Sequence, residues 1–245
     1  MAPETILIIA AGAASGGFIN GLAGFGTSLF ALGWWLQIMP PAQAVPVALV
    51  MSVASGLQGV ALVRRSIDWP RLLRFLLPAV AGVPLGLMLL SEIEAQPLKI
   101  VIAVFLVIYG GFLAFRRDLP NISRPTPVID AGVGFASGVL GALAGLSGAL
   151  PTMWSSLRSW GKSERRALLQ PFNVAILGLS ALVLALTGGI GRSSLVAMLI
   201  ALPVTMLSAQ LGIAVFKRLS DGQFRRLVIV LMLVSGVVLL LREAL

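Results

Sequence analysis

The sequence contains no cysteine and no histidine, and only 11% of its 245 residues are charged. Without cysteine, the chain has no disulfide framework, no thiolate nucleophile and no cysteine-ligated metal site. Without histidine, it also lacks the side chain most often used for proton transfer near neutral pH. These absences exclude much of enzyme chemistry. We expect the protein not to be an enzyme, and to use no cofactor and no metal.

Charged residues are too few to cover the surface of a water-soluble domain, because hydrophobic residues make up 58% of the chain. Apolar stretches of roughly 20 residues, the length that crosses a bilayer, recur along the whole sequence. The sequence therefore predicts a multi-pass membrane protein surrounded by the lipid bilayer. Its 18 basic and 9 acidic residues occur mainly between apolar runs, so we expect no nucleic-acid partner.

Charged or proline-rich turns divide the apolar stretches into two similar sets. Each set opens with a stretch that glycines interrupt, and three uninterrupted spans follow. In residues 1–119 the interrupted stretch is 6–39 and the spans are 42–63, 72–90 and 98–115. In residues 128–245 the interrupted stretch is 131–160 and the spans are 167–186, 195–216 and 224–241. The polar stretch between the two sets is the expected boundary between two halves.

Short sequence matches indicate that the two halves are repeats. Leu22-Ala23-Gly24-Phe25 returns as Leu143-Ala144-Gly145-Leu146, and Leu85-Gly86 returns as Leu211-Gly212. The spacing drifts from about 121 to about 126 residues, as short insertions in loops would produce. Duplication is the economical explanation of this pattern.

Basic residues form four clusters in the connections, and the positive-inside rule predicts that all four face the cytoplasm. The clusters are Arg64, Arg65, Arg71 and Arg74; Arg116, Arg117 and Arg124; Arg158, Lys162, Arg165 and Arg166; and Lys217, Arg218, Arg225 and Arg226. Because the second and third clusters flank the interrupted stretch 131–160, that stretch must enter the membrane and return on the same side.

We therefore expect an all-α, polytopic membrane protein built from two inverted repeats. Each repeat holds one broken, re-entrant helical hairpin, which for residues 6–39 consists of two short helices, and three transmembrane helices. Three crossings are an odd number, which places the two halves in opposite orientations, as in many secondary transporters. The alternative of eight simple crossings in two parallel halves puts a basic cluster on the wrong side of the membrane.

The two glycine-rich loops, Gly21 to Ser28 and Gly141 to Gly148, lie where the hairpins should turn. Unpaired amides at the start of each returning half-helix would offer partial positive charge to an anion. The alternative is that these glycines serve close helix packing. We favour a binding role for the pair of loops and for neutral polar residues in nearby helices. The candidate substrate-binding residues are Asn20, Gly24, Gly26, Thr27, Ser28, Gly145, Ser147, Gly148, Gln170 and Asn173.

These candidates are neutral hydrogen-bonding groups. They suit a small anion that must be bound and then released, which a buried lysine or arginine would hold too strongly. Gly145-Leu146-Ser147-Gly148 also matches the Gly-x-Ser-Gly nucleophile motif of rhomboid intramembrane proteases. Those enzymes need a histidine from another helix, and this chain has none. Hydrolysis within the bilayer is therefore not expected.

Four further motifs resemble the sulfite exporter TauE/SafE family, also called the toluene sulfonate uptake permease family. They are Gly21-Leu22-Ala23-Gly24-Phe25-Gly26, Ala42-Gln43-Ala44-Val45, Ser66-Ile67-Asp68-Trp69 and Gly82-Val83-Pro84-Leu85-Gly86. The resemblance covers nearly the whole chain. It implies transport of sulfite, sulfonates or related organosulfur anions across the cytoplasmic membrane, without a prosthetic group. Members typically carry a Gly-x-Gly-Gly-Gly run in each half, and this chain departs from that run in both loops.

The main hypothesis is therefore a transporter whose partner is a small sulfur-containing anion. One alternative is a non-transporting membrane scaffold or assembly factor in which the polar residues only tie helices together. Another is a transporter of a different small organic anion. The sequence leaves the exact substrate, the direction, the coupling ion and assembly into a homo-oligomer open.

Overall fold

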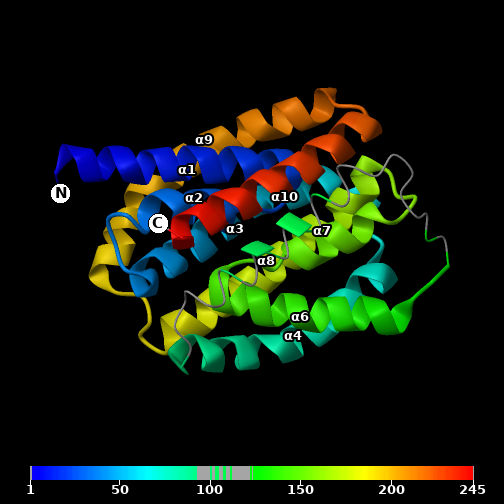
Figure 1. Ribbon diagram of the computed structural model, residues 1–245, viewed down its shortest axis with the longest axis horizontal. Coiled ribbons are helices and arrows are strands. Elements are labelled where there is room, and N and C mark those ends of the chain that lie inside the picture. The colour runs from blue at the N-terminus through cyan, green and yellow to red at the C-terminus, as the bar shows by residue number, and fades with distance from the viewer. Residues whose placement is uncertain are drawn as a thin grey trace.

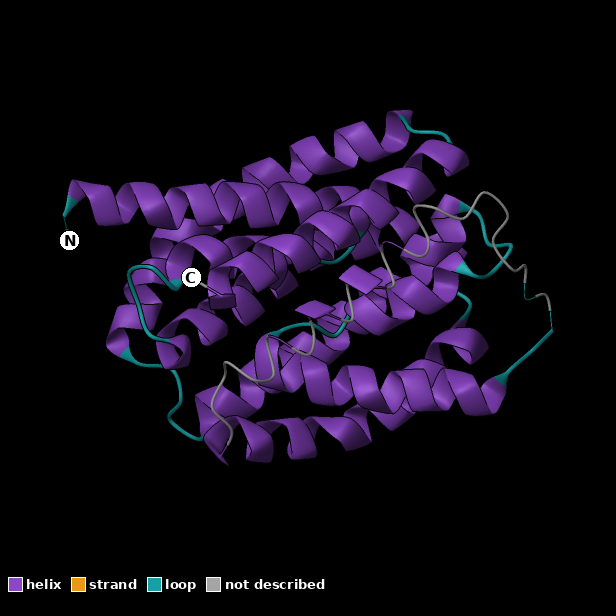
Figure 2. Cartoon of the chain, in the orientation of Figure 1, coloured by secondary structure: helices purple, strands orange, loops and turns teal. Residues whose placement is uncertain are grey.

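The computed structural model describes residues 2–92 and 124–244, together with residues 100, 103, 104, 107, 108, 111 and 122. Within these residues every regular element is a helix, which confirms the all-α prediction. Figures 1 and 2 show the helices packed side by side. The predicted span 98–115 lies largely outside the described residues.

Ten helical elements are described. The first part of the chain holds α1 (Pro3–Ala23), α2 (Thr27–Trp35), α3 (Pro41–Val63), the 3-10 helix η1 (Arg64–Ser66) and α4 (Trp69–Glu92). The second part holds α6 (Pro127–Ala144), α7 (Ala149–Ser156), α8 (Lys162–Leu186), α9 (Arg192–Arg218) and α10 (Asp221–Ala244). Six of the described helices, namely α1, α3, α4, α6, α8 and α9, are long and apolar enough to cross a bilayer.

Helices α1 and α2 form an antiparallel pair. Trp35, at the end of α2, donates its indole N–H to the carbonyl oxygen of Ile9 at 3.1 Å, and its ring packs on Gly12. Helix α2 therefore returns toward the end of the bundle from which α1 starts. The prediction of two short helices is wrong for α1, because α1 has 21 residues and only α2, with 9, is short.

The glycines of α1 do not break it, because neighbouring helices occupy the space that their missing side chains leave. Gly12 and Gly16 face α2, while Gly17 and Gly21 face the backbone of α9. Glycine costs a helix only about 1 kcal/mol relative to alanine. Close approach of a second helix offsets that cost, because small residues let two backbones pack in direct contact.

Helices α6 and α7 form the second antiparallel pair. Asp130, in the first turn of α6, accepts a hydrogen bond from the indole N–H of Trp154 in α7 at 2.7 Å. The same carboxylate pairs with Arg158, just beyond α7, at 3.2 Å, and both of these charged side chains are buried. The start of α6 and the end of α7 are therefore tied together.

The two helical pairs are packed reciprocally against the rest of the bundle. Helix α1 runs along α9 and helix α6 runs along α4, while α3 and α8 pack against each other (Figure 1). Gly212 of α9 lies against the carbonyl oxygen of Phe18 in α1. In the same way, Gly86 of α4 lies against the carbonyl oxygen of Val139 in α6.

Basic residues from several connections meet at one end of the bundle, which we name the basic end. Arg71, in the first turns of α4, pairs with Glu164 in the first turn of α8 at 3.6 Å. The backbone N–H of Lys162, where α8 begins, donates to the carboxylate of Asp221, where α10 begins, at 3.2 Å. The starts of α4, α8 and α10 therefore lie together.

The opposite end of the bundle holds the starts of α3 and α9. Ser194, in the first turn of α9, donates its hydroxyl hydrogen to the carbonyl oxygen of Gln43, in the first turn of α3, at 3.1 Å. Helix α9 then runs to the basic end, where the ammonium group of Lys162 donates to the carbonyl oxygen of Leu219. Helices α3 and α8 consequently begin at opposite ends of the bundle.

Candidate functional site

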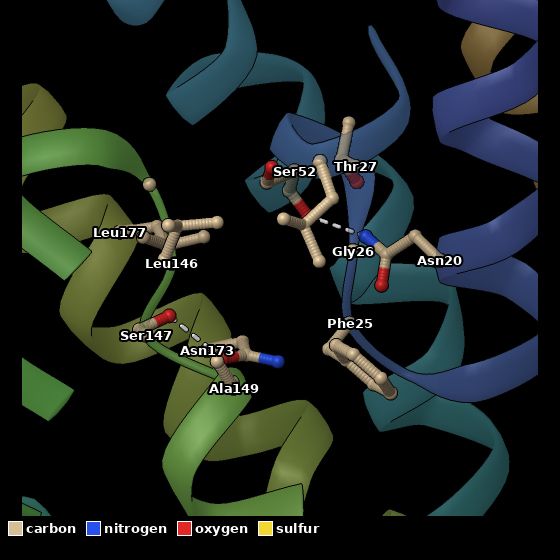
Figure 3. Close-up of a pocket in the computed structure, with 13 residues that line it drawn as sticks. Asn20, Phe25, Gly26, Thr27, Ser52, Leu146, Ser147, Ala149, Asn173 and Leu177 are labelled. Atoms are coloured by element: carbon tan, nitrogen blue, oxygen red, sulfur yellow. Dashed lines mark hydrogen bonds between the residues drawn. The ribbon is translucent and has the colours of Figure 1, made fainter. Parts of the chain in front are cut away.

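A pocket lies where the α1–α2 turn and the α6–α7 turn approach each other, between α3 and α8 (Figure 3). About 300 Å³ of space free of protein atoms lies between its lining residues, and this volume includes open solvent. Its lining residues are Asn20, Phe25, Gly26, Thr27, Leu29, Ser52, Gly145, Leu146, Ser147, Gly148, Ala149, Asn173 and Leu177. Seven of the ten residues expected from the sequence line this pocket: Asn20, Gly26, Thr27, Gly145, Ser147, Gly148 and Asn173. Gly24, Ser28 and Gln170 do not line it and lie directly behind its wall.

The pocket lies at half depth of the bundle. Ser52 is at the middle of α3 (Pro41–Val63), and Asn173 is near the middle of α8 (Lys162–Leu186). Both helices are long and apolar enough to cross a bilayer. Backbone that is not helical is tolerated at such a depth only where protein buries it or where it lines a cavity.

Glycines produce the two turns at the pocket. Gly24 and Gly145 have φ values of 85° and 69° and end α1 and α6 as left-handed caps. Gly26, immediately before α2, has a φ of 97°. Residues with a Cβ rarely adopt this conformation. Gly148 serves a different need, since a Cβ there would lie 2.6 Å from the Cβ of Phe25.

The N-termini of α2 and α7 face this one pocket. Gly26, Thr27 and Leu29 line it from the start of α2, and Gly148 and Ala149 line it from the start of α7. The first N–H groups of a helix lack partners within the helix and carry the positive end of its dipole. These two ends contribute partial positive charge to the pocket without a formal charge.

Helix α7 offers fewer free amides than α2. The N–H of Ala149 already donates to the carbonyl oxygen of Leu146 at 3.2 Å, and Pro151 has no N–H. Helix α2 contains no proline. Most of the amide donors at the pocket therefore come from the start of α2.

Two buried hydroxyl groups at the start of α2 have no hydrogen-bond partner in the described part of the chain. The side chains of Thr27 and Ser28 are each 1% exposed, and their oxygen atoms are unpaired. Buried hydroxyls in proteins are nearly always hydrogen-bonded. Thr27 lines the pocket, so its hydroxyl hydrogen is available to an acceptor inside it.

Asn173 connects the two turns. Its side-chain N–H donates to the carbonyl oxygen of Gly24 at 2.8 Å. Its side-chain oxygen accepts a hydrogen bond from the hydroxyl of Ser147 at 2.7 Å (Figure 3). The hydroxyl of Ser147 is fully buried. The α1–α2 turn and the α6–α7 turn are thus held to one residue of α8.

Asn20 differs from the other polar residues because its donors are already used. Its amide nitrogen donates to the carbonyl oxygen of Ser52 at 3.1 Å and to the hydroxyl of Ser55 at 2.7 Å. Its oxygen accepts from the amide of Gln170 at 3.4 Å. Asn20 therefore ties α1 to α3 and α8 and has no free N–H for a solute.

Sequence reasoning missed the apolar part of the pocket wall. Phe25, Leu29, Leu146 and Leu177 line it together with the residues that carry hydroxyl and amide groups. Figure 3 labels Phe25, Leu146 and Leu177. Phe25 and Leu146 follow Gly24 and Gly145 in the repeated motif, so the repeat itself was a signal for them. The wall combines donors for an anion with contacts for an apolar group.

Sequence reasoning also placed Arg166 in a polar connection, and this placement is wrong. Arg166 lies within α8 and is 0% exposed. Its guanidinium donates to the carbonyl oxygen of Gly21 at 2.6 Å and to that of Leu22 at 3.2 Å. Arg166 does not line the pocket, so the residues that line it are all uncharged. The available signal was the spacing of Arg166, Gln170 and Asn173, which share one face of a helix.

Comparison with known proteins assigns the chain to a family. None of the curated proteins compared with the chain matches it. The family model described as sulfite exporter TauE/SafE matches residues 8–239, a range that contains every residue lining the pocket. The chain is therefore a member of the sulfite exporter TauE/SafE family, which consists of multi-pass membrane transporters and not of enzymes.

Proposed function

We propose that this transporter moves small sulfur-containing anions, such as sulfite and organosulfonates, through the pocket between the two turns. One observation carries the proposal: the starts of α2 and α7 and the unpaired hydroxyl of Thr27 line one pocket at half depth of the bundle. Oxygen atoms of such an anion accept hydrogen bonds from amide and hydroxyl groups. The apolar side chains of the wall offer contacts to the carbon part of a sulfonate.

The donors of the pocket fit transport better than permanent binding. Amide and hydroxyl groups hold an anion by partial charges, so the anion can leave again. A lysine or arginine that lined the pocket would hold the anion more tightly, and no lining residue carries a charge. The polar residues therefore bind a solute in passage and do not only tie helices together.

We also propose that residues 1–119 and 128–245 are two inverted repeats whose hairpins enter the membrane from opposite sides. The reciprocal packing of α1 on α9 and α6 on α4 supports this arrangement. The contacts of Gly212 with Phe18 and of Gly86 with Val139 correspond under exchange of the two parts. Helices α3 and α8 begin at opposite ends of the bundle, as inversion requires.

Thermal unfolding of the purified protein tests the proposed substrate class. A ligand at 100 times its Kd stabilises the folded state by about 2.7 kcal/mol, so methanesulfonate and sulfite should raise the Tm measurably. Chloride and acetate at equal concentration provide the comparison. Uptake of methanesulfonate into proteoliposomes then tests transport itself. We expect saturable uptake that protein-free liposomes lack.

Two serine variants supply a matched pair for these assays. Ser147→Ala removes a hydroxyl from the pocket. Ser156→Ala removes a buried hydroxyl of α7 that donates to the carbonyl oxygen of Thr152, and Ser156 does not line the pocket. We expect the first to lower uptake and the second to leave it near the wild-type rate. The proposal would be contradicted if no sulfur-containing anion raised the Tm and none was taken up. Preference for acetate would instead support a transporter of another class of organic anion.

A further inference from the structure

Arg166 carries a charge that the binding site described so far does not use. Its side chain is fully buried in α8, and its guanidinium carbon lies 4.2 Å from the ring centroid of Phe216. No carboxylate forms an ion pair with it among the residues that the structure describes. A guanidinium stays charged at neutral pH, so the protein keeps one positive charge here without a counter-ion.

This charge lies directly behind the first turn of the pocket. Arg166, Gln170 and Asn173 follow one another along one face of α8. At Gly24, an added Cβ would lie 3.5 Å from the Cγ of Arg166 and 2.9 Å from the side-chain oxygen of Gln170. Asn173 lies seven positions after Arg166 in the helix, which corresponds to about 10 Å along the helix axis.

Arg166 offsets an unfavourable electrostatic interaction between a bound anion and the end of α1. Helix α1 ends at the pocket with its carbonyl groups, which carry about half a negative charge and repel an anion. Arg166 donates to the carbonyl oxygens of Gly21 and Leu22, and Asn173 donates to that of Gly24. These three hydrogen bonds mask the negative end of α1.

In the part of the chain that the structure describes, no arginine or lysine side chain donates to the carbonyl end of α6 at the second turn. Helix α6 ends with hydrogen bonds from Gly145 to Gly141 and from Leu146 to Leu140, all within the backbone. A spacing of 121 residues relates Arg166 and Gln170 to Val45 and Leu49, which are apolar and buried in α3. The extra charge therefore belongs to one side of the pocket only.

We propose that Arg166 is a positioning and specificity-determining residue that holds the end of α1 and makes the pocket favour dianions over monoanions. The inference rests on the anion site proposed above. At about 10 Å and an effective dielectric constant of about 20, one unit charge changes the binding constant of a monoanion roughly tenfold. The interaction energy of the same charge with a dianion is twice as large, so the binding constant of the dianion changes roughly a hundredfold.

Isothermal titration with methanesulfonate, a monoanion, and sulfate, a dianion, tests this selectivity. For Arg166→Gln we expect the Kd to rise about tenfold for methanesulfonate and about a hundredfold for sulfate. The ratio of the two constants therefore changes about tenfold. Arg166→Lys keeps the charge and should keep the ratio near its wild-type value. Arg65→Gln is the matched control, because Arg65 is exposed and water screens its charge.

A second variant decides the question if Arg166→Gln does not fold. Gln170→Glu adds a carboxylate one helical turn from Arg166 with almost no change in shape, and it offsets the charge of the guanidinium. We expect the ratio of the Kd for sulfate to the Kd for methanesulfonate to rise at least as much as in Arg166→Gln.

The outcomes separate the inference from the proposed function. Equal weakening of both anions in Arg166→Gln, or an unchanged ratio in Gln170→Glu, would show that Arg166 has a structural role alone. Wild-type protein that binds neither anion would contradict the proposed site, and the inference with it. Wild-type protein that binds both, with a ratio that no variant changes, would contradict the inference alone.

Discussion

Replacing Thr27 by valine should separate solute binding from stability. Valine has nearly the same shape as threonine and lacks only the hydroxyl. The hydroxyl of Thr27 is buried and makes no hydrogen bond within the described residues, so its removal breaks no contact of the protein. The folded state should be as stable as the wild type, or more stable, because an unpaired buried hydroxyl costs free energy.

The effect on anion binding should be large. A hydrogen bond to a charged group contributes about 1.5–3 kcal/mol. If the hydroxyl of Thr27 donates to a bound anion, its loss should raise the Kd for methanesulfonate roughly 10- to 150-fold. The Tm without ligand should stay within a few degrees of the wild-type value or rise.

Titration calorimetry and thermal unfolding of the same preparations measure the two quantities. Thr205→Val is the matched control, because Thr205 in α9 is also fully buried with an unpaired hydroxyl and does not line the pocket. The Kd of Thr205→Val for methanesulfonate should equal that of the wild type. An unchanged Kd in Thr27→Val, or an equal change in both variants, would refute the assignment of this hydroxyl to the site.

Three further changes have defined outcomes. Gly148→Ala places a Cβ 2.6 Å from that of Phe25, so methanesulfonate uptake into proteoliposomes should fall at least about tenfold while circular dichroism stays helical. Asp130→Asn leaves the buried guanidinium of Arg158 without its carboxylate, so the free energy of unfolding should fall by about 3–5 kcal/mol in a denaturation series. Gly138→Val overlaps the backbone of α4, so the Tm should fall by several degrees and anion binding should weaken only as folded protein is lost.

The sequence was sufficient to place most of the described helices. The apolar stretch 42–63 corresponds to α3 at Pro41–Val63, because bilayer thickness and helix rise together determine the length of a span. It was not sufficient for α1. Whether Gly17 breaks a helix depends on what packs against it, and here the backbone of α9 at Thr205 fills the space. Contacts between segments so far apart are not visible in local composition.

The same limit applies to the site. The repeated glycine motifs identified both turns that line the pocket, because left-handed backbone at the end of a helix favours glycine. Arg166 was missed because basic clusters near span ends are typical of solvated loops. Its burial depends on the carbonyl groups of α1, which approach it from a segment more than 140 residues away.

The hydroxyl of Ser147 has a single hydrogen, and the side-chain oxygen of Asn173 accepts it. A solute that takes this hydrogen leaves the side-chain oxygen of Asn173 without its partner. The α6–α7 hairpin then loses one of its attachments to α8, while the bond from Asn173 to Gly24 still holds the other hairpin. Binding of a solute to the Ser147 hydroxyl would therefore release the α6–α7 turn from Asn173 and leave the α1–α2 turn attached to the same side chain.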